Sequence, residues 1–208
     1  MTRIMARACA LVAASLVAFS LAACANTNDA APETTSPPTP TTTAPTTTTE
    51  TPTPPYDPYA TVENPQPTQL KIPSLGLDHP VVPSETNAEA IDPPKGTLEW
   101  YNGLARVSPG DVGTAIISGH VAWGSKPDIF QRLSELQTGQ TFTIGDNPQA
   151  FTVTDAFLMH KEELPDNNEV WGENRDTRRI VLITCDDALG YGSDGHRTAN
   201  YVVIAEAK

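Results

Sequence analysis

The stretch Ile180-Val-Leu-Ile-Thr-Cys185-Asp-Asp187 passes from an apolar, β-branched run to a cysteine and then directly to two acidic residues. This composition predicts a buried β-strand. Two similar runs, Thr114-Ala-Ile-Ile-Ser-Gly-His120 and Arg197-Thr-Ala-Asn-Tyr-Val-Val-Ile204, carry a histidine at the end and an arginine at the start. We therefore expect a thiol, an imidazole and a guanidinium to meet in one groove at the ends of three strands.

The chain of 208 residues is divided by composition into three parts. Residues 1–24 are apolar after a basic start, residues 25–68 consist mainly of Thr, Pro and Ala, and residues 69–208 have the mixed composition of a folded domain. A domain of that length can bury one ordinary core. The formal net charge of -12 argues against a nucleic-acid partner, because phosphate binding requires clustered Lys and Arg.

The first part has the pattern of a secretory signal. Arg3 and Arg7 precede a short apolar segment that ends in Leu21-Ala-Ala-Cys24. This ending resembles the bacterial lipobox, in which the cysteine is lipidated and becomes the mature N-terminus. An uncleaved membrane anchor is the alternative. Both alternatives place the rest of the chain on the extracytoplasmic face of the cell membrane, tethered by lipid or by an N-terminal anchor.

Residues 25–68 are expected to form a disordered linker. The segment has almost no large aliphatic side chains, so it cannot bury enough surface to offset chain entropy. Frequent proline favours extended polyproline II, with a rise of about 3.1 Å per residue. We interpret this segment as a stalk that holds the domain away from a membrane.

Many short strands, few helices and regular turns predict an all-β domain, either a small closed barrel or a sandwich. Strands are expected near residues 70–82, 114–118, 141–144, 151–158, 179–184 and 198–205. A short helix is expected over residues 128–136, with Asp128 as its cap. Residues 94–103 are expected to be irregular, and residues 159–176 to form a long loop with one helical turn.

The three polar strand-end residues suit acyl transfer. A thiol with a reference pKa of about 8.5 needs a neighbour that accepts its proton, because the thiolate is the nucleophile. His120 can act as base for Cys185 and as acid for a leaving amine, while Arg197 can stabilise the oxyanion. The structural alternatives are a buried Cys185 that acts as a small hydrophobe and a surface arginine. His196 is a rival base, which strand alternation would direct away from the side that Arg197 faces.

Together these residues resemble the sortases, the cysteine transpeptidases of Gram-positive cell surfaces. Leu182-Ile-Thr-Cys185 matches the family's Leu-X-Thr-Cys strand, Gly119-His120 its Gly-His, and Arg197 its arginine on the following strand. The resemblance covers about residues 70–208 and is greater to the smaller actinobacterial sortases of class E or F. No segment ahead of the barrel carries a cysteine-blocking lid motif.

The resemblance implies a closed eight-stranded β-barrel with one or two short helices. It implies that Cys185 cleaves an LPXTG-like sorting signal of a secreted protein between Thr and Gly, forms a thioacyl-enzyme, and passes the protein to an amine of a peptidoglycan precursor. His120, Cys185 and Arg197 would be catalytic, and Thr184 would contact the substrate. No cofactor and no metal site are expected, and a monomer is expected.

The sequence lacks the motifs of two other classes of cysteine enzyme. An L,D-transpeptidase would carry a Ser-His-Gly-Cys-like stretch, and a papain-like protease a Cys-Gly-Ser-Cys-Trp-like start; the sequence has neither. A non-catalytic surface lipoprotein that displays a β-barrel binding module is the alternative from another class. The reactivity of the Cys185 thiol distinguishes the two, because the thiol should react slowly in a binding module and rapidly in an enzyme.

Overall fold

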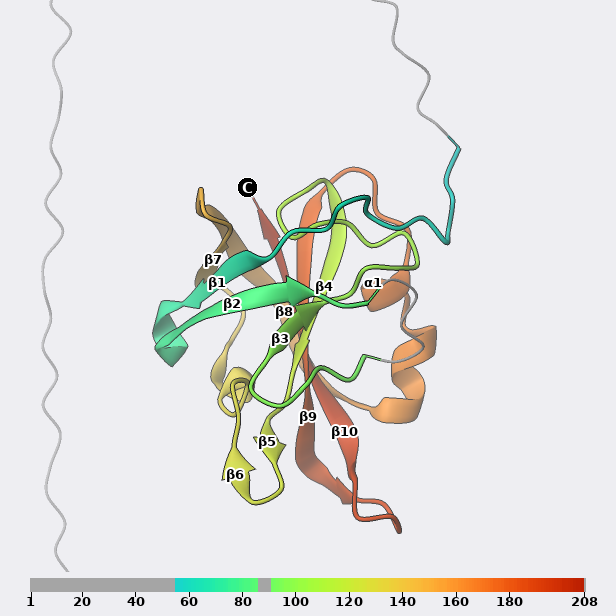
Figure 1. Ribbon diagram of the computed structural model, residues 1–208. Helices are drawn as coiled ribbons and strands as arrows, with labels where there is room; N and C mark the ends of the chain where they lie inside the picture. Colours follow the sequence, from blue (N-terminus) through green and yellow to red (C-terminus); the bar gives the residue numbers. More distant parts are fainter. Residues whose placement is uncertain (1–54, 86–90, 208) are drawn as a thin grey trace, which may run out of the picture. The chain divides into compact units, whose positions relative to one another are not determined.

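The structure is a computed structural model that describes residues 55–85 and 91–207. The expected signal segment, Cys24 and most of the expected linker lie outside these residues. The described residues form a closed barrel with the strand order β1-β2-β3-β4-β9-β10-β8-β7 (Figure 1), which confirms the barrel and excludes the sandwich. The barrel strands are β1 (Thr68–Ile72), β2 (Leu77–Pro83), β3 (Leu98–Trp100), β4 (Gly113–Gly119), β7 (Thr141–Ile144), β8 (Gln149–His160), β9 (Arg178–Tyr191) and β10 (Arg197–Ala207).

The remaining elements are short. A two-stranded hairpin projects from one end of the barrel, beside the turn that joins β9 to β10 (Figure 1). The helical elements lie between strands and have six residues or fewer. The hairpin strands are β5 (Ala122–Trp123) and β6 (Lys126–Pro127). The helical elements are η1 (Pro73–Leu75), η2 (Leu133–Glu135), η3 (Lys161–Asp166) and α1 (Asn168–Trp171).

The strands β4, β9 and β10 have a hydrophobic cluster on each face, because successive side chains point to opposite sides of a strand. Alternate residues such as Ile117, Leu182 and Val203 belong to the larger cluster, which also contains the fully buried Trp100. The residues between them form a second cluster with side chains from η3 and α1. Its buried members are Tyr101, Ile116, Met159, Val170, Val181, Ile183, Val202 and Ile204.

Two pairings in the barrel are parallel, β2 with β3 and β4 with β9. Antiparallel neighbours can be joined by a tight turn, whereas a parallel pair needs a longer crossover. Between β4 and β9 the chain therefore forms the hairpin, η2, β7, β8, η3 and α1 before it returns. The parallel register aligns Ser118 with Ile183, which brings the carboxyl ends of the two strands to the same end of the barrel.

The helix expected over residues 128–136 is wrong in extent. The structure forms turns there and a single 3-10 segment, η2. The Asp128 carboxylate accepts hydrogen bonds from the Ile129 N–H (2.8 Å) and the Gly96 N–H (3.2 Å), which fixes a turn instead of a helix start. Phe130, Leu133 and Leu136 are all buried in the barrel core. The apolar spacing was therefore a sign of burial rather than of a continuous helix.

Strand β3 was not expected, because its three residues lie in a stretch with aromatic side chains and no clear alternation. Strand β9 also extends seven residues beyond Thr184, into the stretch expected to be a loop. Strands β5 and β6 were not expected either, because residues 121–127 were expected to form a loop. The other strands lie where the sequence predicts them, with differences at their ends. The described chain begins within the segment expected to be linker, and there the Val62 N–H donates to Asn102 Oδ1 at 2.8 Å.

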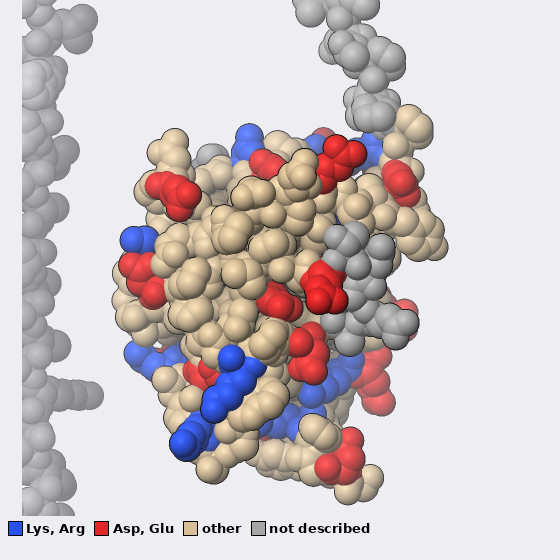
Figure 2. All heavy atoms as spheres, viewed as in Figure 1, with Lys and Arg blue, Asp and Glu red and all other residues tan. Residues whose placement is uncertain are grey.

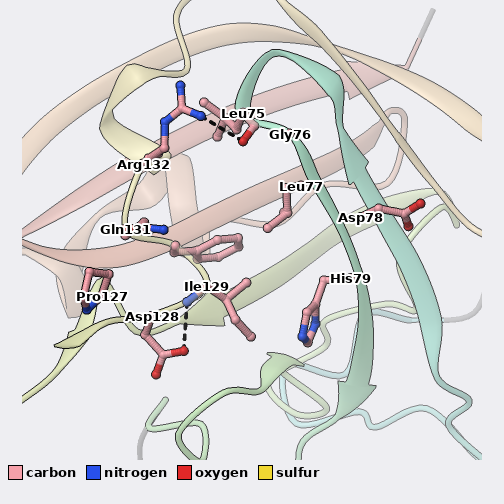
Figure 3. Close-up of a pocket in the computed structure, with 11 residues that line it drawn as sticks. Leu75, Gly76, Leu77, Asp78, His79, Pro127, Asp128, Ile129, Gln131 and Arg132 are labelled. Atoms are coloured by element: carbon pink, nitrogen blue, oxygen red, sulfur yellow. Dashed lines mark hydrogen bonds between the residues drawn. The ribbon is translucent and has the colours of Figure 1, made fainter.

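The segment that follows the hairpin is attached to the β1–β2 connection. Arg132 Nη1 donates to the Leu75 carbonyl at 3.1 Å, and both residues line a cavity of about 400 Å³ (Figure 3). His79 also lines this cavity, and its Nδ1 donates to the Pro80 carbonyl at 2.7 Å. The cavity shares no lining residue with the one that contains Cys185. The face of the domain in Figure 2 carries acidic and basic side chains next to one another.

Candidate active site

His120 follows the last residue of β4, and its place depends on the glycine before it. A Cβ on Gly119 would overlap Leu98 Cδ2 and would come within 2.9 Å of the Phe130 ring, so the strand end fits only a residue without a side chain. The His120 carbonyl accepts the Phe130 N–H at 3.0 Å, which fixes the backbone beyond the strand. The imidazole makes an edge contact with Trp123 of the hairpin, with 5.0 Å between ring centroids.

Cys185 lies on β9, beside the end of β4. Because Ser118 aligns with Ile183, two further residues on each parallel strand bring the chain to His120 and Cys185. Cys185 is half-buried and forms no disulfide. The preceding Thr184 is buried, and its hydroxyl donates to the Gly119 carbonyl at 2.8 Å. This hydrogen bond joins the residue before the thiol to the residue before the imidazole.

Arg197 begins β10, the other neighbour of β9. The pairing between these strands is irregular between Arg197 and Ala199: Arg197 aligns with Tyr191, whereas Asn200 aligns with Cys185. The Arg197 guanidinium lies 5.7 Å from the centre of the Tyr191 ring. Such cation–π contacts hold the guanidinium electrostatically without using its hydrogen-bond donors. Arg197 Nε is buried and has no hydrogen-bond partner among the described residues.

The three predicted residues line one cavity of about 520 Å³ at this end of the barrel. A cavity that joins a thiol, an imidazole and a guanidinium can hold a nucleophile, a proton acceptor and a donor for an oxyanion. His196 lines the same cavity as Arg197, so alternation does not separate the two side chains where the strand pairing is irregular. The cavity is lined by Asp92, His120, Val121, Ala122, Trp123, Gly124, Lys161, Cys185, Tyr191, Gly195, His196 and Arg197.

Sequence reasoning missed Asp92, Trp123 and Lys161 in this cavity, as well as Tyr191, whose ring contacts Arg197. Asp92 Oδ1 lies 3.8 Å from His120 Nε2, although the two residues come from different connections of the barrel. Trp123 ends β5, three residues after His120, and an aromatic side chain so close to a candidate base was the available signal. For Asp92 and Lys161 no periodicity or motif offered one.

A second cavity of about 580 Å³ lies next to the first, and Lys161 lines both. Its wall is mainly aromatic and apolar, which is typical of sites that bind apolar groups. The segment before β1, the end of the β2–β3 connection, and the elements η3 and α1 all contribute to it. It is lined by Tyr56, Pro58, Tyr59, Ile91, Tyr101, Leu104, Lys161, Leu164, Pro165 and Trp171.

Arg106 holds the backbone of α1, which forms one wall of this second cavity. It is 4% exposed, and its guanidinium donates to the Val170 carbonyl at 3.1 Å and the Trp171 carbonyl at 3.2 Å. It also lies 5.9 Å from the centre of the Trp171 ring. Burial lowers the pKa of Arg106 from its usual value, an effect that the nearby Tyr56 partly opposes. A guanidinium stays charged under these conditions and can hold two carbonyls at once.

A sortase domain model matches residues 70–208, two thirds of the chain, and the chain therefore belongs to the sortase family. Sortases are membrane-associated transpeptidases of the cell surface. A search of curated proteins found no match. In the described residues no helix is long and apolar enough to cross a membrane. Nor do residues 55–85 and 91–207 group three His, Cys, Asp or Glu side chains that could hold a metal ion.

Solved sortase structures share the fold. A lid mutant of sortase A from Corynebacterium diphtheriae matches with a TM-score of 0.52 at 17% identity, over 71% of this chain and 72% of that one. The pilus-related sortase C of Group B Streptococcus matches with a TM-score of 0.52 at 16% identity, over 71% and 69%. Sortase C-1 from Actinomyces oris matches with a TM-score of 0.50 at 17% identity, over 68% and 73%.

Proposed function

We propose that this protein is a cysteine transpeptidase that cleaves an LPXTG-like sorting signal between Thr and Gly and transfers the protein to a cell-wall amine. The observation that carries the proposal is the single cavity lined by Cys185, His120 and Arg197 at one end of a sortase-type barrel. Membership of the sortase family supports the transpeptidase reaction.

The proposed reaction has two steps. In the first, the Cys185 thiolate attacks the carbonyl carbon of the threonine, and His120 gives its proton to the departing glycine amine. The peptide bond breaks, and a thioester joins Cys185 to the threonine. In the second step, His120 takes a proton from the acceptor amine, which attacks the thioester and releases the Cys185 thiolate. Arg197 stabilises the negative oxygen in both steps, and removal of such a donor typically lowers the rate by about 10²–10³.

The second cavity is the candidate site for the apolar residues of the sorting signal. It shares the lining residue Lys161 with the catalytic cavity and has an apolar wall that includes Tyr101 and Trp171. A peptide that binds there would place its next residues beside Cys185. For Thr184, which was expected to contact substrate, the buried hydrogen bond to Gly119 supports a role in joining the two catalytic strands.

The proposed cellular arrangement rests on the sequence. Residues 1–24 would export the chain and tether it, either as an anchor or by lipid on Cys24, and residues 25–68 would link it to the catalytic domain at 69–208. The enzyme would then act as a monomer on the extracytoplasmic face of the membrane. The sequence likeness to class E or F sortases supports membership of those classes.

Mass spectrometry of the purified full-length chain, mixed with an LPXTG-like peptide and a small amine, tests the function. We expect a product in which the peptide, cut after threonine, is joined to the amine. Cys185→Ala and Arg197→Ala should abolish or strongly reduce it. Arg132→Ala is the matched control, since Arg132 is exposed and lines the cavity beside the β1–β2 connection, which shares no lining residue with the catalytic cavity.

The same experiment distinguishes the competing interpretations when thiol labelling is added. No cleavage, together with rapid labelling of Cys185, would show that the thiol is activated but the substrate is different. No cleavage and slow labelling would refute the enzyme and favour a surface lipoprotein that displays a non-catalytic barrel. The location of all three polar groups in one cavity argues against that second class.

A further inference from the structure

The imidazole of His120 has one polar atom whose role the proposed reaction leaves open. Its Nε2 is buried and makes no hydrogen bond to a described residue. The side chain as a whole is 16% exposed, so water has little access to it. A buried ring nitrogen without a partner is unfavourable unless a group approaches it during function. The acidic atom that faces it is Asp92 Oδ1, at 3.8 Å.

Asp92 is well placed to approach His120. Its side chain is 81% exposed, and it lies in the connection between β2 and β3, outside the strands. A separation of 3.8 Å is longer than a hydrogen bond but within the range of an ion pair. A side-chain rotation that moves Asp92 Oδ1 by about 1 Å would therefore convert the contact into a hydrogen bond, without movement of the barrel.

Several charged or titratable groups surround the imidazole, and the carboxylate nearest to it is that of Asp92. Cys185 approaches from β9, Lys161 from η3, and His196 and Arg197 from the start of β10. Glu99 lies on β3, paired with Ser118, the residue two before His120. Lys161 and Arg197 bring positive charge to this cavity, and Asp92 is the acidic residue that lines it.

We propose that Asp92 is a positioning residue for His120, one that binds Nε2–H and leaves the other ring nitrogen to exchange protons with the thiol and the substrate amine. This inference rests on the proposed function, since it assigns the acid–base role to His120. The carboxylate fixes the tautomer of the ring and favours the imidazolium that forms when the Cys185 proton is transferred. The pair of thiolate and imidazolium is then more populated.

The test compares the full-length wild-type chain with Asp92→Asn, Asp92→Glu and Asp146→Asn. Asp146→Asn is the matched control, because it removes the same charge from the β7–β8 turn. This turn lies at one end of β8, whereas Lys161 of the catalytic cavity follows the other end. The first readout is the rate at which iodoacetamide alkylates Cys185 near neutral pH, which requires no substrate. We expect Asp92→Asn to slow alkylation by about 2- to 5-fold at low salt, while Asp92→Glu restores most of the rate.

Salt and pH separate positioning from a structural effect. An exposed carboxylate is screened by salt, so the difference between wild type and Asp92→Asn should shrink at about 1 M NaCl. The pH profile of alkylation should also change for Asp92→Asn and stay the same for Asp146→Asn. The thermal midpoint should be unchanged in both variants, because Asp92 is exposed.

With peptide and amine, Asp92→Asn should lower kcat and leave the KM for each substrate unchanged. A higher KM for the amine with normal alkylation would overturn the proposal and make Asp92 an acceptor-binding residue instead. Alkylation equal to that of Asp146→Asn would also overturn it. Wild-type chain that alkylates rapidly but joins no peptide to amine would refute the substrate assignment, and the alkylation comparison would still decide the role of Asp92.

Discussion

The Thr184 hydroxyl donates a hydrogen bond of 2.8 Å to the Gly119 carbonyl, although the two residues are 65 positions apart in the chain. Each is followed directly by a candidate catalytic residue, Cys185 or His120. Both partners are buried, so the bond is protected from exchange with water. It links the end of β4 to β9 at the point where the proposed base and nucleophile lie.

Thr184→Val removes this hydrogen bond and keeps the shape of the side chain. A buried carbonyl left without its donor destabilises a protein by about 1–3 kcal/mol. We expect a lower thermal midpoint and a lower kcat, with little change in the KM for peptide. Thr184→Ser, which keeps the hydroxyl, should recover activity. A large rise in KM for Thr184→Val with normal kcat would instead support direct contact of Thr184 with the substrate.

Gly119→Ala should disrupt the end of β4. The added methyl group would overlap Leu98 Cδ2 and crowd the Phe130 ring in a fully packed region. Overpacking of this kind destabilises proteins by about 1–3 kcal/mol. Urea denaturation measures the change. The double variant Gly119→Ala/Leu98→Val makes room for the methyl group and should be less destabilised than the sum of its single variants; strict additivity would contradict the proposed overlap.

Glu99→Gln should stabilise the protein at neutral pH. Burial raises the pKa of Glu99, and the charges of Glu85 and Asp92 raise it further. The folded protein thus holds the Glu99 proton more tightly than the unfolded chain, so stability is lost as pH rises through the raised pKa. We expect Glu99→Gln to have the higher thermal midpoint at about pH 7 and no advantage at about pH 3.5, where both side chains are neutral. An equal gain at both pH values would indicate packing rather than ionisation.

Arg106→Lys should loosen the α1 wall of the second cavity. Lysine lacks the planar fork with which two separate guanidinium nitrogens reach the Val170 and Trp171 carbonyls, and hydrogen bonds from charged groups contribute about 1.5–3 kcal/mol each. We expect a loss of stability of about 2–4 kcal/mol and faster hydrogen exchange in residues 161–177. Arg132→Lys, at an exposed ion pair, is the control and should change little. Unchanged exchange in Arg106→Lys would show that other contacts hold the segment.

The fold was predictable where the sequence has continuous apolar, β-branched runs. The runs that end at His120 and Cys185, and the run that begins at Arg197, are buried strands because their apolar residues serve two hydrophobic clusters at once. Strand β3 escaped prediction, since three residues are too few to establish a period. The segment at 128–136 was misjudged because burial of Phe130 and Leu133 in the barrel imitates the spacing of a helix.

The site was predictable in part for a related reason. The grouping of Cys185, His120 and Arg197 in one cavity follows from their places at the ends of apolar runs, which a sequence reveals. Asp92 comes from a connection whose path is determined by tertiary packing, so nothing local marks its approach to His120. His196 was placed on the wrong side because regular alternation was assumed where the pairing of β9 and β10 is irregular.

The place of β10 between β9 and β8 has a consequence for the order of events in folding. The barrel cannot close until this strand is in place, because β8 and β9 have no direct ladder with one another in the part of the chain that the structure describes. The β4–β9 pairing joins distant parts of the chain as well, and non-local pairings of this kind form slowly. The thiol, the imidazole and the guanidinium therefore come together only in the last stage of folding. Under the proposed function, the reactivity of Cys185 would then report that the barrel has closed.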